Sequence, residues 1–145
     1  MERLIQRLQG LFRSDTTPDH LRKGSQGEKA AERFLRRRGY KLLARNFASK
    51  RGEIDLIFRD RDCMVFVEVK TRSGETWSRP AAAVDADKRK NICKTALDYL
   101  RKLHFPRCKI QFDIVEVLLD DGEQVCEVRH LPNAFQMTEP LRYQG

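Results

Sequence analysis

Two hydrophobic, strand-like runs joined by a short charged connection constrain the fold of this chain most. They read Gly52-Glu53-Ile54-Asp55-Leu56-Ile57-Phe58 and Met64-Val65-Phe66-Val67-Glu68-Val69-Lys70-Thr71. The charged connection between them predicts an antiparallel hairpin with its turn at Arg61-Asp62. Counting inward from that turn places Asp55 opposite Glu68. Because side chains alternate between the two faces of a strand, Phe66 and Lys70 are expected on the same face as these acids.

The two opposed acids require a positive charge beside them. Asp55 and Glu68 each lie between apolar residues, where desolvating an unpaired carboxylate is costly. Directly opposed side chains have Cβ atoms about 5 Å apart, and two like charges at that distance repel by roughly 3 kcal/mol at an effective dielectric of about 20. A structural ion pair with Lys70 would leave the second carboxylate unexplained. A divalent cation with Lys70 beside it accounts for the whole set.

Composition narrows the class of protein. The chain has 145 residues, enough for one domain with its own core, and a formal net charge of +8 that makes a polyanion the first partner to consider. No apolar run approaches a membrane span and no signal-peptide layout opens the chain, so no membrane is expected. The cysteines form no close pair that would indicate zinc or a redox dithiol: Cys63, Cys93, Cys108 and Cys126. We therefore expect a cytoplasmic protein.

The chain divides into an appendage, a domain and a tail. Apolar residues at helical spacing predict a short amphipathic helix over residues 2–13, followed by a polar linker to residue 23. This helix is expected to be poorly fixed or docked onto a partner protein. Residues 24–135 are expected to form the domain, and residues 136–145 a frayed tail.

Within the domain, the elements are expected in the order α-β-β-β-α-β-β. Ser25, with Glu28 three residues later, fits a capping box, so a helix is expected to begin there and to end at Gly39. The later elements are a strand over Tyr40–Phe47, the hairpin, a loop over Arg72–Ala83, a helix capped by Asp85 and closed by Pro106, and strands over Lys109–Leu119 and Glu123–Leu131. The strand, helix, strand passage over 63–119 favours a right-handed crossover between parallel strands. The sequence therefore predicts an α/β fold with a mixed sheet flanked by helices.

The acids and the lysine form a set suited to phosphodiester hydrolysis. Mg²⁺, or Mn²⁺ in its place, prefers oxygen ligands and commonly takes one or two carboxylates. Asp55 and Glu68 supply carboxylates, and the carbonyl of Val69 is within reach. A bound cation makes water more acidic and stabilises charge on a phosphate, while Lys70 would orient or activate that water. This chemistry needs no histidine, and the histidines lie away from the hairpin, at positions 20, 104 and 130.

Basic residues flank the hairpin on both sides in the sequence. A solvated helix face would explain such a run, but both groups converge on the predicted cation site along the chain. Phosphate contacts of this kind set position and affinity without reading sequence. The residues expected to contact nucleic acid are Arg36, Arg37, Arg38, Lys50, Arg51, Arg72, Arg79, Lys88 and Lys90.

Asp55 followed by Glu68-x-Lys70 on the next strand, after a helix bearing Glu28, resembles the PD-(D/E)xK nuclease superfamily. More narrowly, the chain resembles the YraN-type bacterial family of predicted endonucleases, which is related to archaeal Holliday-junction resolvases. The resemblance covers about Gly24 to Phe135 and is carried by Gly27-Glu28, Arg51–Ile57, Phe66–Arg72, Pro80–Val84, Lys88, Phe112-Asp113 and Asn133-Ala134-Phe135. The signature departs from the superfamily pattern because Ile54-Asp55 lacks the preceding proline.

The resemblance implies a restriction-endonuclease-like core in which Asp55, Glu68 and Lys70 are the catalytic set. It also implies that Glu28 is a supporting acid on the first helix and that Lys88 is an assisting base on the second. The expected function is metal-dependent cleavage of DNA, including branched DNA, where paired cuts would need a homodimer. The alternative is a nucleic-acid-binding module that cleaves weakly or not at all and acts through a partner.

Overall fold

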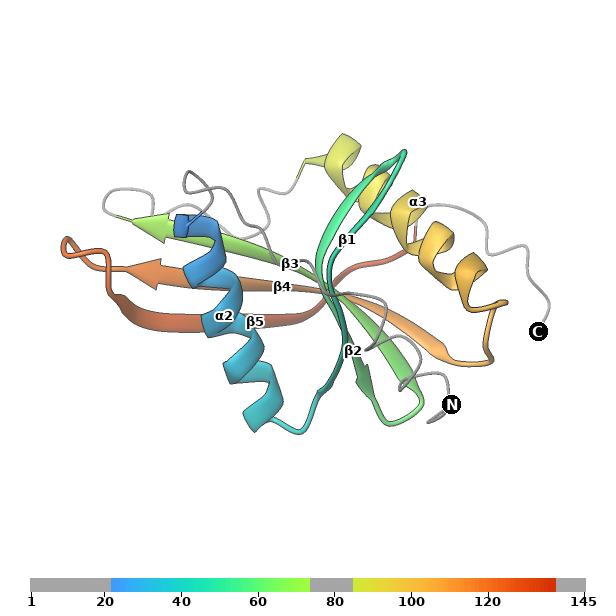
Figure 1. The fold of residues 1–145 in the computed structure, drawn as a ribbon, viewed down its shortest axis with the longest axis horizontal. Coiled ribbons are helices and arrows are strands. Elements are labelled where there is room, and N and C mark those ends of the chain that lie inside the picture. The colour runs from blue at the N-terminus through green and yellow to red at the C-terminus, as the bar shows by residue number, and fades with distance from the viewer. Residues whose placement is uncertain (1–21, 74–84, 138–145) are drawn as a thin grey trace.

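The computed structural model describes residues 22–73 and 85–137. The predicted helix over residues 2–13, Arg79 and the end of the tail lie outside these described residues. The elements are α2 (Arg22–Arg37), β1 (Lys41–Ser49), β2 (Gly52–Asp60), β3 (Cys63–Ser73), α3 (Ala86–Lys102), β4 (Lys109–Leu119) and β5 (Val125–Phe135). Their order, α-β-β-β-α-β-β, confirms the predicted fold class (Figure 1).

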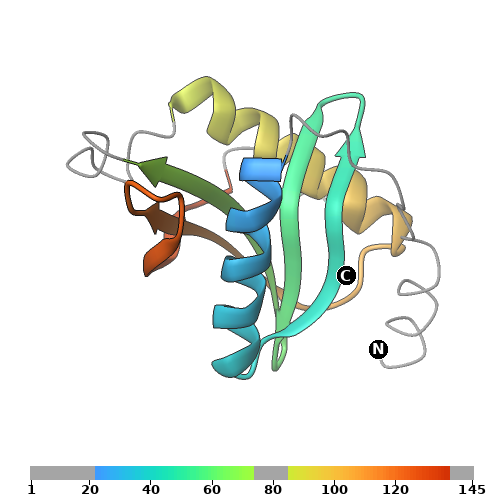
Figure 2. The ribbon, with the colours of Figure 1, turned by 60° about the vertical axis from the view of Figure 1, so that its left-hand side comes forward.

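The strands form one mixed sheet with the spatial order β1-β2-β3-β4-β5. All neighbouring strands pair antiparallel except β3 and β4, which pair parallel across the α3 crossover, as predicted. The two helices pack on opposite faces of this sheet (Figures 1 and 2). One core cluster joins α3 to Phe66 and Ile57, and the other joins α2 to Val67 and Leu56.

The β2–β3 hairpin has the predicted register. Asp60 pairs with Cys63 beside the turn, and the ladder continues to Leu56 opposite Val67. The next position inward is Asp55 opposite Glu68, where the regular ladder ends. The alternation of faces breaks at this point, because Ile54 packs in the same cluster as Ile57 instead of with Leu56. Asp55 therefore occupies an irregular position in an otherwise regular strand.

Helix α2 differs from the predicted helix at its beginning. It begins at Arg22, so Ser25 and Glu28 lie inside the helix and the predicted capping box is wrong. An N-cap residue needs non-helical backbone angles, and Ser25 already has a helical backbone. The end of the helix is as predicted: the chain turns at Gly39, whose φ of +92° is in the range that glycine adopts without strain.

Helix α3 begins as predicted. Asp85 is its N-cap, and the Asp85 carboxylate accepts a hydrogen bond of 2.7 Å from the backbone N–H of Lys88. This cap fixes Lys88 in the first turn of the helix. None of the helices in the described ranges is long and apolar enough to cross a membrane.

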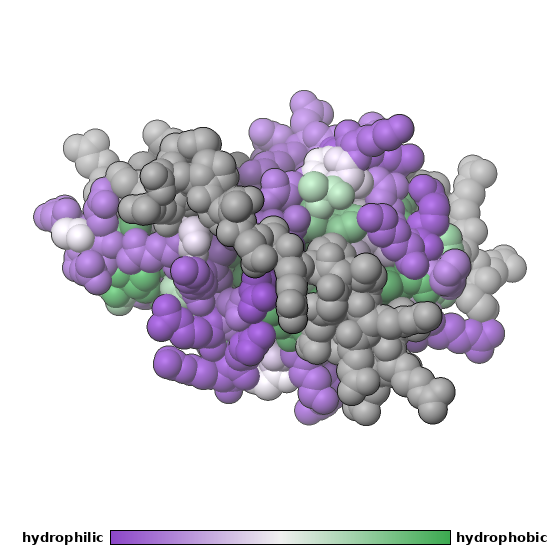
Figure 3. Space-filling model, viewed as in Figure 1, coloured by the Kyte–Doolittle hydropathy of each residue, from purple (hydrophilic) through white to green (hydrophobic). Residues whose placement is uncertain are grey.

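Strand β5 extends four residues beyond its predicted end at Leu131, to Phe135. The extension follows from burial, because the Phe135 ring stacks on Phe112 of β4 with centroids 5.0 Å apart. Pro132 has no backbone N–H to donate. It is tolerated because β5 is an edge strand, with no neighbouring strand on one of its sides. In Figure 3 the surface over α2 and α3 is mainly hydrophilic.

Candidate active site

The site forms where β2 and β3 cease to pair through their backbones. There the Asp55 side chain replaces the backbone as the link between the two strands. Its Oδ2 accepts a hydrogen bond of 2.8 Å from the backbone N–H of Val69. In a strand, the N–H and C=O of one residue point toward the same neighbouring strand. The carbonyl of Val69 is therefore directed to the β2 side as well, where Asp55 lies.

Glu68 occupies the centre of a compact charged group. Its side chain is only 7% exposed, and its Oε1 lies 2.6 Å from Nζ of Lys88 and 3.7 Å from Nζ of Lys70. Lys70 comes from the same strand, whereas Lys88 reaches in from the first turn of α3. The fold thus brings together Asp55, Glu68, Lys70 and Lys88, four of the five residues predicted to be catalytic.

Glu28, the fifth, approaches from α2 on the other side. In the amide orientation in which its nitrogen faces the acids, Asn46 donates to Glu28 Oε2 at 3.1 Å and to Glu53 Oε1 at 3.2 Å. Asn46 has a φ of 49°, which matches the irregular position of Asp55 on the adjacent strand. The negative charge of Glu28 is close enough to Asp55 to raise the pKa of Asp55, and the charge of Glu68 raises the pKa of Glu28 in the same way.

The acids of the site suppress one another's ionisation. Burial raises the pKa of Asp55 to about 8, and the neighbouring Glu68 carboxylate adds to this rise. Burial also raises the pKa of Glu28, against the effect of the Asn46 hydrogen bond. Negative charge is therefore held at this site at an energetic cost, which a bound cation would reduce.

The two lysines differ in character. Burial lowers the pKa of Lys70, and the adjacent Lys88 ammonium lowers it further. For Lys88, burial acts in the same direction, but the hydrogen bonds to Glu68 and Lys70 outweigh it and the pKa of Lys88 is raised. Lys88 is therefore held as a cation, and Lys70 loses its proton more readily.

The donor set fits a hard divalent cation with open coordination positions. No group of three or more His, Cys, Asp or Glu side chains that could hold a metal ion occurs within residues 22–73 and 85–137. Two carboxylates and a backbone carbonyl nevertheless match the ligands that Mg²⁺ takes when it keeps several waters. Asp55, Glu68 and Val69 are the residues that would hold such an ion.

The basic residues predicted to contact nucleic acid do not form one cluster. Arg36, Arg37 and Arg38 lie at the C-terminal end of α2, about 14 Å along the helix axis from Glu28 at roughly 1.5 Å per residue. Arg51 lies 3.8 Å from Asp98 of α3. Arg72 is directed inward, with its side chain 11% exposed and its Nε 2.8 Å from Glu116. Lys50 and Lys90 are exposed.

A second buried polar group contains Asp113, a residue that belongs to the family resemblance but to which the sequence patterns assign no role. Asp113 of β4 is fully buried, and its Oδ2 lies 2.6 Å from Nε2 of His130 on β5. Its Oδ1 accepts hydrogen bonds from the Gln111 side chain at 2.8 Å and the Asn133 backbone at 2.9 Å. The signal that could have found this group is an acid inside an apolar strand, the same signal that identified Asp55.

The described residues define an α/β protein whose mixed sheet carries an acidic and lysine-rich site at a point where two strands separate. A family model described as "Uncharacterised protein family UPF0102" matches residues 27–117, a range that includes every candidate catalytic residue. The chain belongs to this family.

Bacterial relatives support the assignment. A UPF0102 protein of Trichlorobacter lovleyi is 41% identical over 115 residues, which cover 79% of this chain and 90% of the relative. One from Caldanaerobacter subterraneus subsp. tengcongensis is 44% identical over 113 residues, covering 77% of this chain and 93% of the relative. A third, from Pelobacter propionicus, is 39% identical over 126 residues, covering 86% and 89% respectively.

Proposed function

We propose that this protein is a metal-dependent endonuclease of the PD-(D/E)xK type that hydrolyses phosphodiester bonds in DNA. The observation that carries the proposal is the meeting of Asp55, Glu68 and Lys70, with the two acids on adjacent strands. A pair of acids buried at this cost has no structural use that a neutral pair would not serve better. The resemblance of the surrounding motifs to nucleases points to the same chemistry.

The charge of each residue at the site suits it to a separate role in hydrolysis. Asp55, Glu68 and the Val69 carbonyl would hold Mg²⁺ or Mn²⁺, which would supply Lewis-acid stabilisation of charge on the phosphate. Lys70, with its lowered pKa, is suited to accept a proton from the attacking water. Lys88, with its raised pKa, is better suited to neutralise phosphate charge than to act as the assisting base.

DNA is the substrate class that the charge of the chain favours. The net charge of +8 attracts a polyanion, and the exposed Lys50 and Lys90 lie on either side of the site in sequence. Branched DNA is the substrate that the resemblance to junction resolvases favours. A homodimer would be required if two strands are cut in a coordinated way.

One observation favours a second candidate, a nucleic-acid-binding module with little or no cleavage. The two acids already have partners within the protein, because Val69 donates to Asp55 and Lys88 lies 2.6 Å from Glu68. A site satisfied in this way could persist without a cation and without chemistry. In that case the activity would depend on a partner protein.

Cleavage of a labelled panel separates the two candidates. The panel contains a four-way junction, a flap, a single strand and a duplex, each with Mg²⁺, Mn²⁺ or EDTA. Wild type is compared with Glu68→Ala and with Glu127→Ala, a matched control on the exposed surface of β5. Cleavage that needs both the metal and Glu68, and that Glu127→Ala retains, supports the nuclease. Salt-sensitive binding without cleavage by the wild type supports the binding module instead.

A further inference from the structure

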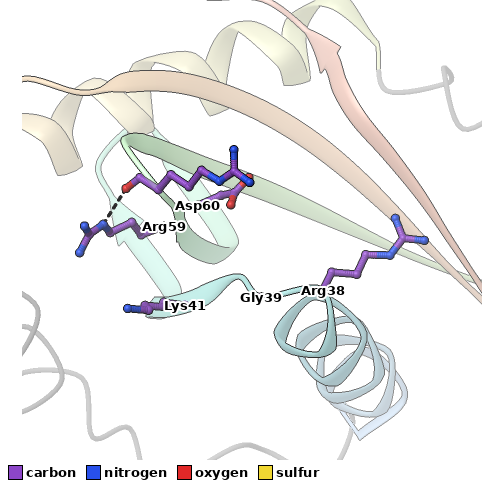
Figure 4. Close-up of a pocket in the computed structure, with 6 residues that line it drawn as sticks. Arg38, Gly39, Lys41, Arg59 and Asp60 are labelled. Carbon is purple, nitrogen blue, oxygen red and sulfur yellow. Dashed lines mark hydrogen bonds between the residues drawn. The ribbon is translucent and has the colours of Figure 1, made fainter.

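A basic pocket lies at the far end of β2 from Asp55. Its volume is about 330 Å³, and its lining comes from the end of α2, the start of β1 and the β2–β3 turn (Figure 4). The lining residues are Arg38, Gly39, Lys41, Arg59, Asp60 and Arg61. Four of these six carry a positive charge, and only Arg38 belongs to the surface predicted from the sequence to contact nucleic acid.

Two of the cations are placed against each other. Lys41 of β1 and Arg59 of β2 are directly paired across the antiparallel ladder, so their side chains leave the sheet on the same face. Figure 4 shows both side chains extending to the same side of the hairpin. Like charges at directly opposed positions destabilise a sheet. Among the described residues, neither cation has an ion-pair partner closer than 4 Å.

The Arg59 guanidinium is held in position by the turn that follows it. Its Nε donates a hydrogen bond of 2.8 Å to the backbone carbonyl of Arg61, whose φ of 57° turns that carbonyl back toward β2. Its Nη1 is buried and makes no hydrogen bond with the described residues. A buried donor on a charged group without an acceptor is costly, so a negative charge bound beside this guanidinium would be favourable.

The acid of the lining does not block this arrangement. Asp60 follows Arg59 directly in the strand, so alternation directs its carboxylate to the opposite face. In Figure 4 the Asp60 carboxylate lies away from Lys41 and from the Arg59 guanidinium. The Lys41 and Arg59 side of the pocket is therefore free of negative charge from the lining.

We infer that Lys41 and Arg59 form a phosphate-binding subsite. Resting on the proposed function, we assign its ligand as a backbone phosphate of the nucleic acid that the Asp55 and Glu68 site would cut. Asp55 and Arg59 are separated by about 13 Å along β2, at roughly 3.3 Å per residue. Measured along the axis of a duplex, that length spans about four base pairs, at about 3.4 Å of axial rise each. The subsite would fix the position of the substrate relative to the cut.

Titration with inorganic phosphate tests the subsite without any reference to cleavage. Backbone amide NMR signals of the ¹⁵N-labelled wild type are expected to shift saturably at Gly39, Lys41 and Arg59 to Arg61. Arg59→Gln and Lys41→Gln should each weaken binding at least tenfold, while Arg129→Gln on the opposite edge strand should leave it unchanged. Because Lys41 is exposed at the start of an edge strand, its substitution preserves the fold. Absence of saturable shifts in the wild type, or equal binding by Lys41→Gln, would overturn the subsite.

A second titration identifies the source of the phosphate. Duplex and junction DNA are titrated in EDTA, so that no cleavage occurs, at several salt concentrations. Lys41→Gln should reduce the log–log salt slope of DNA binding by about 1, the value expected for one lost phosphate contact. An unchanged slope with intact phosphate binding would assign the pocket to free phosphate and overturn the nucleic-acid ligand. If Lys41→Gln reduces the salt slope as expected but the wild type cuts no DNA when metal is supplied, the subsite is upheld and the nuclease is refuted.

Discussion

Gly27 of α2 and Thr71 of β3 are in such close contact that a methyl group at position 27 would overlap Oγ1 of Thr71 and lie 3.3 Å from its Cβ. Helix α2 therefore approaches the sheet as closely as its backbone allows at this point. Glu28 is the next residue on the helix, and Lys70 is the residue before Thr71 on the strand. The contact fixes the distance at which the helix presents Glu28 to the acids on the sheet.

Gly27→Ala should displace α2 and destabilise the protein by about 1–3 kcal/mol, the range for overpacking of a tight contact. Urea denaturation measures the change. Thr71→Ala should relieve part of the loss when the two substitutions are combined, because the overlapping atom is the Thr71 hydroxyl. Gly122→Ala is the matched control, since a methyl group at position 122 would lie an ordinary 3.4 Å from its nearest neighbour, Oδ1 of Asp120. Additive losses in the double variant would contradict a direct contact.

Without metal, the protein should lose stability as the pH rises from about 4 to about 8. Asp55 titrates near 3.8 when unfolded, and burial with the Glu68 charge raises its pKa to about 8 in the folded protein. The folded state therefore holds a proton that the unfolded state releases. Its contribution to stability is complete below the lower pKa and is lost by the higher one.

Thermal denaturation in EDTA across that range measures this loss, and Asp55→Asn should flatten the profile relative to the wild type. The asparagine oxygen still accepts the hydrogen bond from Val69, so the comparison isolates the charge. At pH 8, Mg²⁺ should raise the midpoint of the wild type more than that of the variant. Parallel profiles for the two proteins would show that Asp55 does not titrate as described.

Asp55→Asn should reduce metal-dependent DNA cleavage to the level seen in EDTA, with DNA affinity equal to or higher than that of the wild type. The substitution removes a cation ligand and one negative charge, and both changes favour binding over cutting. A nuclease gel and fluorescence anisotropy on the same substrate measure the two effects. Asp62→Asn, an exposed acid in the β2–β3 turn, is the control. Unchanged cleavage by Asp55→Asn would falsify the assignment.

Asp113→Ala should destabilise the protein by about 3–5 kcal/mol, because it leaves His130 and two further donors without their buried acceptor. Asp113→Asn should cost less, about 1–3 kcal/mol, since the amide oxygen replaces one carboxylate oxygen. Chemical denaturation gives both values, with Glu127→Ala on the same sheet as the control. Equal losses for the two variants would mean that the carboxylate charge, which both variants lack, determines the cost, and that neither the retained amide oxygen nor the cavity left by alanine matters.

The proximity of Asp55 to Glu68 was predictable because a short turn fixes the register of a hairpin and because acids inside apolar strands stand out. The start of α2 was not predicted correctly, since Ser25 and Glu28 satisfy a local capping pattern although the helix already begins at Arg22. The end of β5 was missed because Phe135 is ordered by stacking on Phe112, a contact distant in sequence. Arg72 illustrates the same limit, because its pairing with Glu116 depends on the parallel alignment of β3 and β4.

The hydrogen bond from Val69 to Asp55 makes one side chain part of both the chemistry and the architecture. Where a backbone carbonyl would ordinarily join two strands, a carboxylate does so, and truncating it opens the sheet as well as emptying the site. An alanine scan at this position would report a mixture of misfolding and lost activity. Only shape-preserving replacements can separate the two, so the choice of inactive variant here is a structural decision.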